Sequence, residues 1–105
     1  MKLITENEIN KLLQINGKRL VFITNVTDDF VYYVTEHGGC YCTKEKEADY
    51  VIIEDTAEFL KKMNIAKSKD KEIYNAFKTL FDLRNSPEIR AAALDTIANQ
   101  SVYEQ

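Results

Sequence analysis

The sequence predicts one α+β domain, residues 1–105, with a helix first, then an antiparallel meander of three to four strands, and finally three helices packed on the sheet. Two observations carry this prediction. Helix-capping motifs stand near both ends of the chain, and short β-branched and aromatic segments separated by turn residues lie between them. A small β-barrel made from the same strands, followed by the C-terminal helices, is the alternative.

The first segment is predicted to be a capped helix. Thr5 and Glu8 have the spacing of a capping box, and the Asn16-Gly17 pair supplies a left-handed stop. The residues expected on its buried stripe are Ile9, Leu12 and Leu13.

The middle of the chain has the composition of strands. Arg19–Val26 is rich in β-branched residues, and Phe30–Glu36 alternates between two faces after a polar turn. The glycines of His37-Gly38-Gly39 allow a tight hairpin, which would return Cys40–Thr43 along the second strand. After a charged loop, Asp49–Glu54 is predicted as a fourth short strand.

Helical periodicity returns in the last half of the chain. Asp55 and Glu58 repeat the capping-box spacing, and Ser86-Pro87-Glu88 is a strong start signal for a helix that ends near Gln100. Between them lies a longer helix, preceded by the polar link 64–68. Its core-facing stripe is predicted to be Ile73, Tyr74, Phe77, Leu80 and Phe81.

Composition limits the class of protein. With 45% hydrophobic residues and a net charge of −3, the chain is typical of a globular protein with one modest core. The sequence shows neither a signal peptide nor an apolar run that could span a membrane. Two cysteines separated by a single residue cannot form a disulfide framework. These features predict a cytoplasmic protein with reduced thiols and no membrane partner.

No catalytic or cofactor motif is recognisable. Three glycines cannot supply a dinucleotide or Walker loop, and a single histidine excludes two-histidine metal motifs. The sequence therefore predicts a protein that is not an enzyme, with no catalytic residues and no cofactor.

His37, Cys40 and Cys42 form the sharpest cluster of metal-ligand types, with Glu45 or Glu47 available as a fourth ligand for zinc. The spacing of the two cysteines is too short for a zinc knuckle, and both would lie on one face of a strand. We therefore predict two small buried packing thiols and no bound metal. A zinc-dependent or thiol enzyme is the least favoured hypothesis.

The charge distribution points to a binding function. Residues 24–60 contain nine acidic side chains against two lysines, a net charge of −7. Exposed tyrosine is a frequent anchor of protein interfaces. These features predict a protein-binding regulator or inhibitor of the phage or mobile-element accessory type, whose partner has a basic surface. The same features are compatible with a chain that forms a homo-oligomer. The predicted contact residues are Asp28, Asp29, Tyr33, Tyr41, Glu45, Glu47 and Asp49.

A basic cluster supports the alternative function. Five lysines fall within eleven residues, with one aspartate among them. Such a cluster could contact phosphates, which makes a nucleic-acid-binding regulator the second hypothesis. The residues are Lys61, Lys62, Lys67, Lys69 and Lys71.

Overall fold

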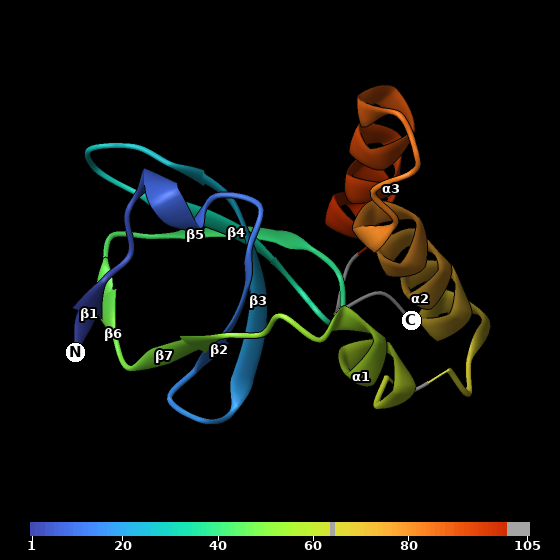
Figure 1. Cartoon of the computed structure of the whole chain (residues 1–105), viewed down its shortest axis with the longest axis horizontal. Helices are drawn as coiled ribbons and strands as arrows, with labels where there is room; N and C mark the ends of the chain where they lie inside the picture. The colour runs from blue at the N-terminus through green and yellow to red at the C-terminus, as the bar shows by residue number, and fades with distance from the viewer. Residues whose placement is uncertain (64, 101–105) are drawn as a thin grey trace. The chain divides into compact units, whose positions relative to one another are not determined.

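The computed structural model describes residues 1–63 and 65–100, and it confirms the α+β class (Figure 1). The chain forms two compact units. The sheet unit consists of Met1–Thr35 and Cys40–Glu54, and the helical unit consists of Glu36–Gly39 and the residues from Asp55 onward.

The sheet unit contains a five-stranded antiparallel sheet. Its spatial order is β5-β4-β3-β2-β7, and a separate two-stranded ribbon is formed by β1 and β6. The two end strands, β5 and β7, are not paired with each other, so the sheet is open and the barrel alternative is wrong. The strands are β1 (Lys2–Leu3), β2 (Leu12–Ile15), β3 (Arg19–Val26), β4 (Val31–Thr35), β5 (Cys40–Thr43), β6 (Glu47–Ala48) and β7 (Tyr50–Ile52).

The predicted β-meander is confirmed for β3, β4 and β5. Strand β3 has the predicted bounds, and Gly38 and Gly39 take φ angles of 89° and 88° in the hairpin that follows β4. These angles lie in the left-handed region that glycine adopts at little cost. The fourth predicted strand is only three residues long, and it pairs with β2 rather than continuing the meander.

The predicted N-terminal helix is wrong. The capping box forms, with the Thr5 N–H donating to Glu8 Oε1 at 2.8 Å, but only the 3-10 turn Glu6–Glu8 follows it. Asn10 then takes a positive φ of 69°, which ends the turn. The chain continues as β2, which pairs with β3 on one side and β7 on the other. A short isolated helix is marginal in water, so these two strand ladders outweigh the local capping signal.

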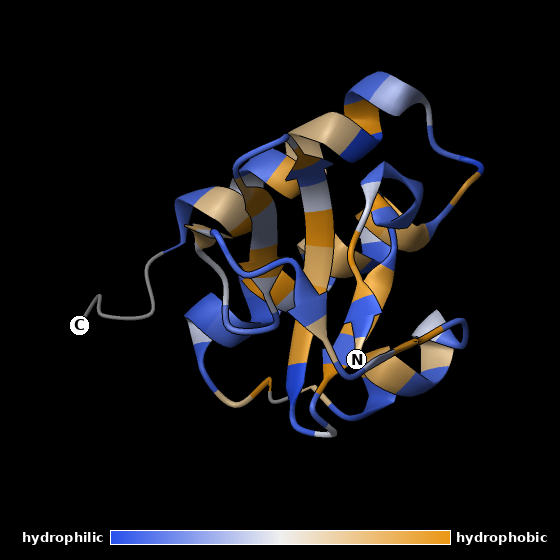
Figure 2. Cartoon of the chain, turned by 90° about the vertical axis from the view of Figure 1, so that its left-hand side faces the viewer, coloured by the Kyte–Doolittle hydropathy of each residue, from blue (hydrophilic) through white to orange (hydrophobic). Residues whose placement is uncertain are grey.

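Burial of β2 on both faces explains why its sequence resembled a helix. Leu12 and Leu13 are adjacent, so in a strand they point to opposite faces, yet both are buried. A strand covered on both faces has no alternation of apolar and polar residues. Figure 2 shows hydrophobic residues, in orange, within both strands and helices.

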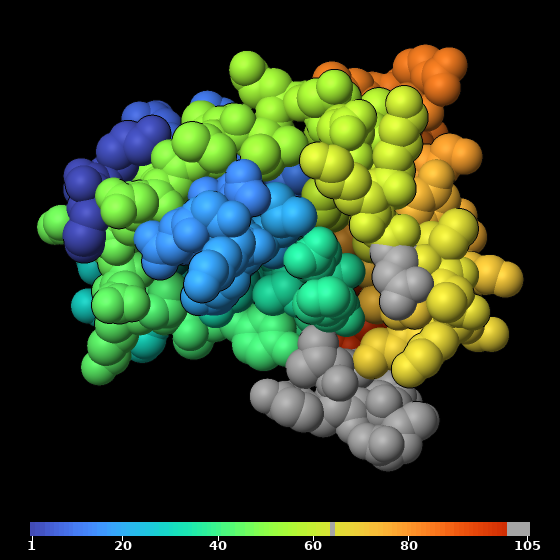
Figure 3. All heavy atoms as spheres, turned by 90° about the horizontal axis from the view of Figure 1, so that it is seen from below, coloured from blue at the N-terminus to red at the C-terminus, as the bar shows by residue number. Residues whose placement is uncertain are grey.

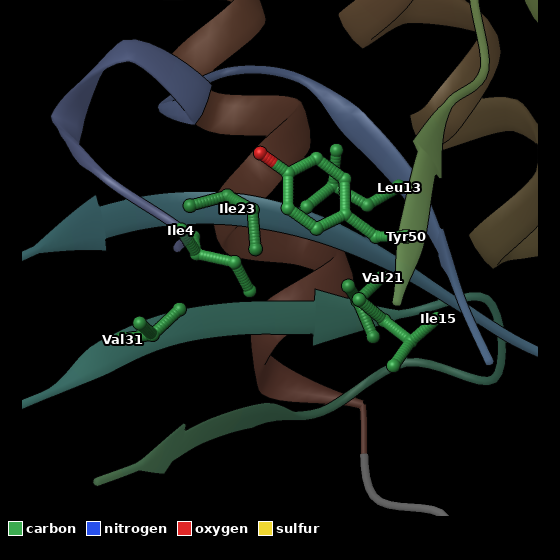
Figure 4. Close-up of a cluster of buried hydrophobic side chains, with 7 residues drawn as sticks. All are labelled: Ile4, Leu13, Ile15, Val21, Ile23, Val31 and Tyr50. Atoms are coloured by element: carbon green, nitrogen blue, oxygen red, sulfur yellow. The ribbon is translucent and has the colours of Figure 1, made fainter. Parts of the chain in front are cut away.

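One cluster of core side chains in the sheet unit lies on a single face of the sheet. Figure 4 shows its side chains pointing toward one another from β2, β3, β4, β7 and the segment before the 3-10 turn. The pKa of Tyr50 is raised, mainly by burial of its hydroxyl and to a smaller extent by the nearby Glu8 carboxylate. The cluster consists of Ile4, Leu13, Ile15, Val21, Ile23, Val31 and Tyr50.

The three C-terminal helices are confirmed, as α1 (Thr56–Lys61), α2 (Ser68–Phe81) and α3 (Pro87–Asn99). Asp55 caps α1 by accepting from the Glu58 N–H, and Ser86 caps α3 by accepting from the Ile89 N–H. The predicted link at residues 64–68 includes Asn64, which lies outside the described residues. None of the helices described is long and apolar enough to cross a membrane.

An aromatic cluster forms the core of the helical unit. The ring of Phe59 meets those of Phe77 and Phe81 edge to face, with centroids 5.4 Å and 5.8 Å apart. In the loop after α2, Arg84 donates two side-chain hydrogen bonds to the Asp82 carboxylate. These bonds, together with a hydrogen bond from the Arg84 backbone N–H, lower the pKa of Asp82 to about 2. The hairpin loop 36–39 also belongs to this unit, because the Gly39 N–H donates to the Ile97 carbonyl oxygen at 2.9 Å.

Candidate functional site

The sheet unit has a cleft of about 240 Å³ on the face that carries its core cluster. The floor of this cleft is apolar. Five of the seven core side chains drawn in Figure 4 line it: Ile4, Ile15, Val21, Ile23 and Val31. These five side chains are at most 8% exposed, so the cleft offers a small nonpolar area below a polar rim.

Four of the predicted contact residues meet at the rim of this cleft. Tyr33 comes from β4, Glu45 from the connection between β5 and β6, Glu47 from β6, and Asp49 from the residue between β6 and β7. The structure thus brings together side chains that are up to sixteen positions apart in the sequence.

The segment around β6 brings three carboxylates to the cleft. Glu45, Glu47 and Asp49 all line it, as does Ala48, which packs against the core cluster. Lys46 points elsewhere, since its Nζ donates to the carbonyl oxygens of Thr27 and Asp28. The backbone here is held by β1, and the Ile4 N–H donates to the Lys46 carbonyl oxygen at 2.6 Å.

Tyr33 is positioned by two neighbours. Its ring stacks on the ring of Tyr41, its cross-strand partner on β5, with centroids 5.8 Å apart and an interplanar angle of 26°. The Arg19 guanidinium lies 5.7 Å from the Tyr33 ring centroid, and its Nη2 donates to Tyr33 Oη at 3.1 Å. Tyr41 does not itself line the cleft, but it supports the residue that does.

Arg19 and the apolar floor were missed by the sequence-based prediction of the site. A signal was present, because Arg19, Val21 and Ile23 alternate along β3 and must share one face. The bulge at Thr24, where the register between β3 and β4 shifts, follows these residues and leaves that face intact.

Asp28 and Asp29 lie outside the cleft. Both are exposed in the turn between β3 and β4, and neither lines the cavity. Their prediction as contact residues is therefore separate from the site that the structure assembles.

The cleft rim carries unpaired negative charge. The Met1 amino group lies 3.3 Å from Asp49 Oδ1. In the part of the chain that the structure describes, no cation lies within ion-pair distance of the carboxylates of Glu45 and Glu47, which are exposed. Two unpaired carboxylates above an apolar floor suit a lysine or arginine side chain, whose aliphatic stem prefers nonpolar surface and whose charged end prefers a carboxylate.

The cysteines lie on the face of the sheet opposite to the cleft. Cys40 and Cys42 alternate with Tyr41 and Thr43 along β5, and both thiols are exposed. Our prediction of buried packing thiols is therefore wrong. Strand β5 stands at the end of the sheet, and both of its cysteines are accessible to solvent. Within residues 1–63 and 65–100, no three His, Cys, Asp or Glu side chains are grouped closely enough to hold a metal ion.

Because both thiols are exposed, we expect a thiol-specific disulfide reagent to modify Cys40 and Cys42 in the folded protein without denaturant. Cys40→Ala and Cys42→Ala should each change the free energy of unfolding by at most about 0.5 kcal/mol, as is usual for surface substitutions. A chelator should leave Tm unchanged in protein purified without a metal-affinity tag. A thiol that reacts only after unfolding would contradict this exposure.

The predicted basic cluster spans two helices and the link between them. Lys61 and Lys62 lie at the end of α1, and Lys67, Lys69 and Lys71 lie at the start of α2. Four of the five are exposed and Lys69 is half-buried; Figure 3 shows this segment, in yellow, at the surface. Lys62 is paired with Glu58, whose Oε1 lies 3.8 Å from Lys62 Nζ. None of these lysines lines the cleft of the sheet unit.

Comparison with known proteins adds no relative to this description. No protein-family model, curated protein or solved structure matches the chain.

Proposed function

We propose that this chain is a non-catalytic protein-binding module that recognises a basic segment of its partner through the acidic cleft of the sheet unit. The observation that carries the proposal is the pair of unpaired carboxylates, Glu45 and Glu47, at the rim of an apolar floor. Tyr33, held between Tyr41 and Arg19, supplies a rigid aromatic wall for the same contact.

The size of the cleft favours a side chain over a cofactor or small substrate. Pockets for such ligands usually enclose about 300–1,000 Å³, whereas this cleft encloses about 240 Å³. The carboxylates at its rim are exposed to solvent. Stoichiometric occupation of a partner's basic surface is the action of a regulator or inhibitor.

Reversing the charge of the rim should abolish most of the binding. We expect the triple variant Glu45→Lys, Glu47→Lys, Asp49→Lys to raise the Kd for the captured partner at least about tenfold at low salt, because each reversed site turns attraction into repulsion. Partners would be isolated from the native host by affinity purification, and Kd would be measured by titration calorimetry with each purified partner. Association of the unaltered protein should slow as salt rises.

A matched control distinguishes the effect of charges at the cleft from the effect of the overall net charge. The triple variant Glu6→Lys, Glu54→Lys, Asp95→Lys reverses three exposed carboxylates outside the cleft and so has the same net charge. It should retain the partner, and circular dichroism should show both variants folded. Equal loss of binding in the two variants, or unchanged binding in the cleft variant, would contradict the proposal. Capture of nucleic acid that depends on Lys67, Lys69 and Lys71 would favour the alternative function instead.

A further inference from the structure

The free edge of β5 borders the acidic cleft. Strand β5 stands at the end of the sheet and, in the described part of the chain, pairs only with β4. Its last residue, Thr43, lines the cleft, and Glu45 follows two residues later. A strand edge that faces solvent presents unpaired backbone N–H and C=O groups.

Strand β5 lacks three of the features by which proteins protect an edge, namely proline, charged side chains and a bulge. Its four residues, CYCT, contain no proline and no charged side chain, and its pairing with β4 is regular over all four positions. The opposite end strand, β7, is shorter and contributes no residue to the cleft. The unpaired edge strand and the acidic rim are thus neighbours at the end of the sheet formed by β5.

We propose that the partner's basic segment binds as an extended strand, which hydrogen-bonds to the free edge of β5 and directs a lysine or arginine side chain into the acidic cleft. This inference rests on the proposed function and specifies the form in which the partner is recognised. Strand addition is an established mode of peptide recognition, in which backbone bonds provide affinity and alternate side chains provide specificity.

The alternation of strand side chains fixes the expected pattern of the bound segment. A strand added beside β5 lies about 4.8 Å from it, and every second side chain points to the cleft face. On β5 that face carries Tyr41 and Thr43, while Cys40 and Cys42 point to the other face. Basic residues at every second position are therefore expected, with uncharged residues beside the thiols.

The test uses a blocked seven-residue peptide of alternating threonine and lysine. One control peptide has norleucine in place of lysine, and a second carries backbone N-methyl groups on alternate residues, so that one edge cannot donate hydrogen bonds. NMR titration of the full chain should show amide shifts at Cys40–Thr43 and at Glu45 and Glu47, and slower amide exchange in β5. We expect each control to bind at least about tenfold more weakly, the change produced by losing one or two hydrogen bonds or a charge-assisted contact.

The outcomes separate strand addition from the proposed function. If both control peptides bind as tightly as the parent, or if none of the three binds, strand addition is overturned. Shifts confined to the cleft, with equal binding of the N-methylated peptide, would also overturn it, while the rim-reversal experiment with the captured partner would still support the proposed function. If two copies of the chain pair through β5, sedimentation will show a dimer that the lysine peptide does not dissociate, and the proposal fails.

Discussion

Replacing Gly38 by alanine is expected to lower the free energy of unfolding by about 3 kcal/mol. A Cβ at this position would lie 2.7 Å from Gln100 Cβ and 3.1 Å from Ile73 Cδ1, and the residue has a positive φ. A left-handed conformation costs a non-glycine residue about 1–2 kcal/mol, and overpacking adds about 1–3 kcal/mol. Gln100 Cβ is bonded directly to the helix C-cap backbone, so it cannot move away cheaply. Urea denaturation followed by far-UV circular dichroism measures the change.

Gly17 provides the matched control for this prediction. It also has a positive φ, of 70°, but a Cβ there would meet no atom within 4 Å. Gly17→Ala should therefore cost only the backbone penalty of about 1–2 kcal/mol. Equal losses in the two variants would show that the hairpin loop does not approach the helices as closely as the structure places it.

Leu13→Ala is expected to lower the free energy of unfolding by about 3–4 kcal/mol, within the range measured for leucine truncation in protein cores. Leu13 is 0% exposed, and it lies in the core cluster on β2, opposite Val21 of β3 and Ile52 of β7. Neighbours on two strands hold the site open, so little collapse can offset the cavity. Tyrosine fluorescence and circular dichroism during urea denaturation would report the loss.

Leu83→Ala is the control for the same change of side chain. Leu83 is 77% exposed in the loop between α2 and α3. We expect a change of at most about 0.5 kcal/mol, as for most surface substitutions. If both leucine variants lose the same stability, the assignment of Leu13 to the core of the sheet unit is wrong.

Stability and binding should respond to different residues. The rim carboxylates are exposed and contribute little to the core, so their reversal is expected to change affinity with little effect on unfolding. Substitutions in the floor are expected to affect both properties, since Val21 and Ile23 belong to the core cluster and also line the cleft. A variant that weakens binding alone therefore has to be sought at the rim, at Glu45 and Glu47.

The candidate site could be predicted only in part. Tyr33, Glu45, Glu47 and Asp49 were identified from charge and composition, and the structure places all four on one cleft. Asp28 and Asp29 had the same acidic character but lie in a separate turn. Composition cannot distinguish these two groups, because the distinction depends on which strands are neighbours across the sheet.

The sequence alone determined those elements whose signals are local. Caps at Asp55 and Ser86, glycines at the hairpin and the β-branched run of β3 act within a few residues, so they specify helices and strands without distant partners. Tertiary structure decided the rest. The segment Leu12–Ile15 became a strand because β3 and β7 pair with it on both sides, although its capping box and leucine pair favoured a helix. Pairing of β6 with β1 and of β7 with β2 also holds the segment that carries Glu45, Glu47 and Asp49, which lines one cleft with residues of β3 and β4. The cleft is therefore assembled by contacts between distant parts of the sequence.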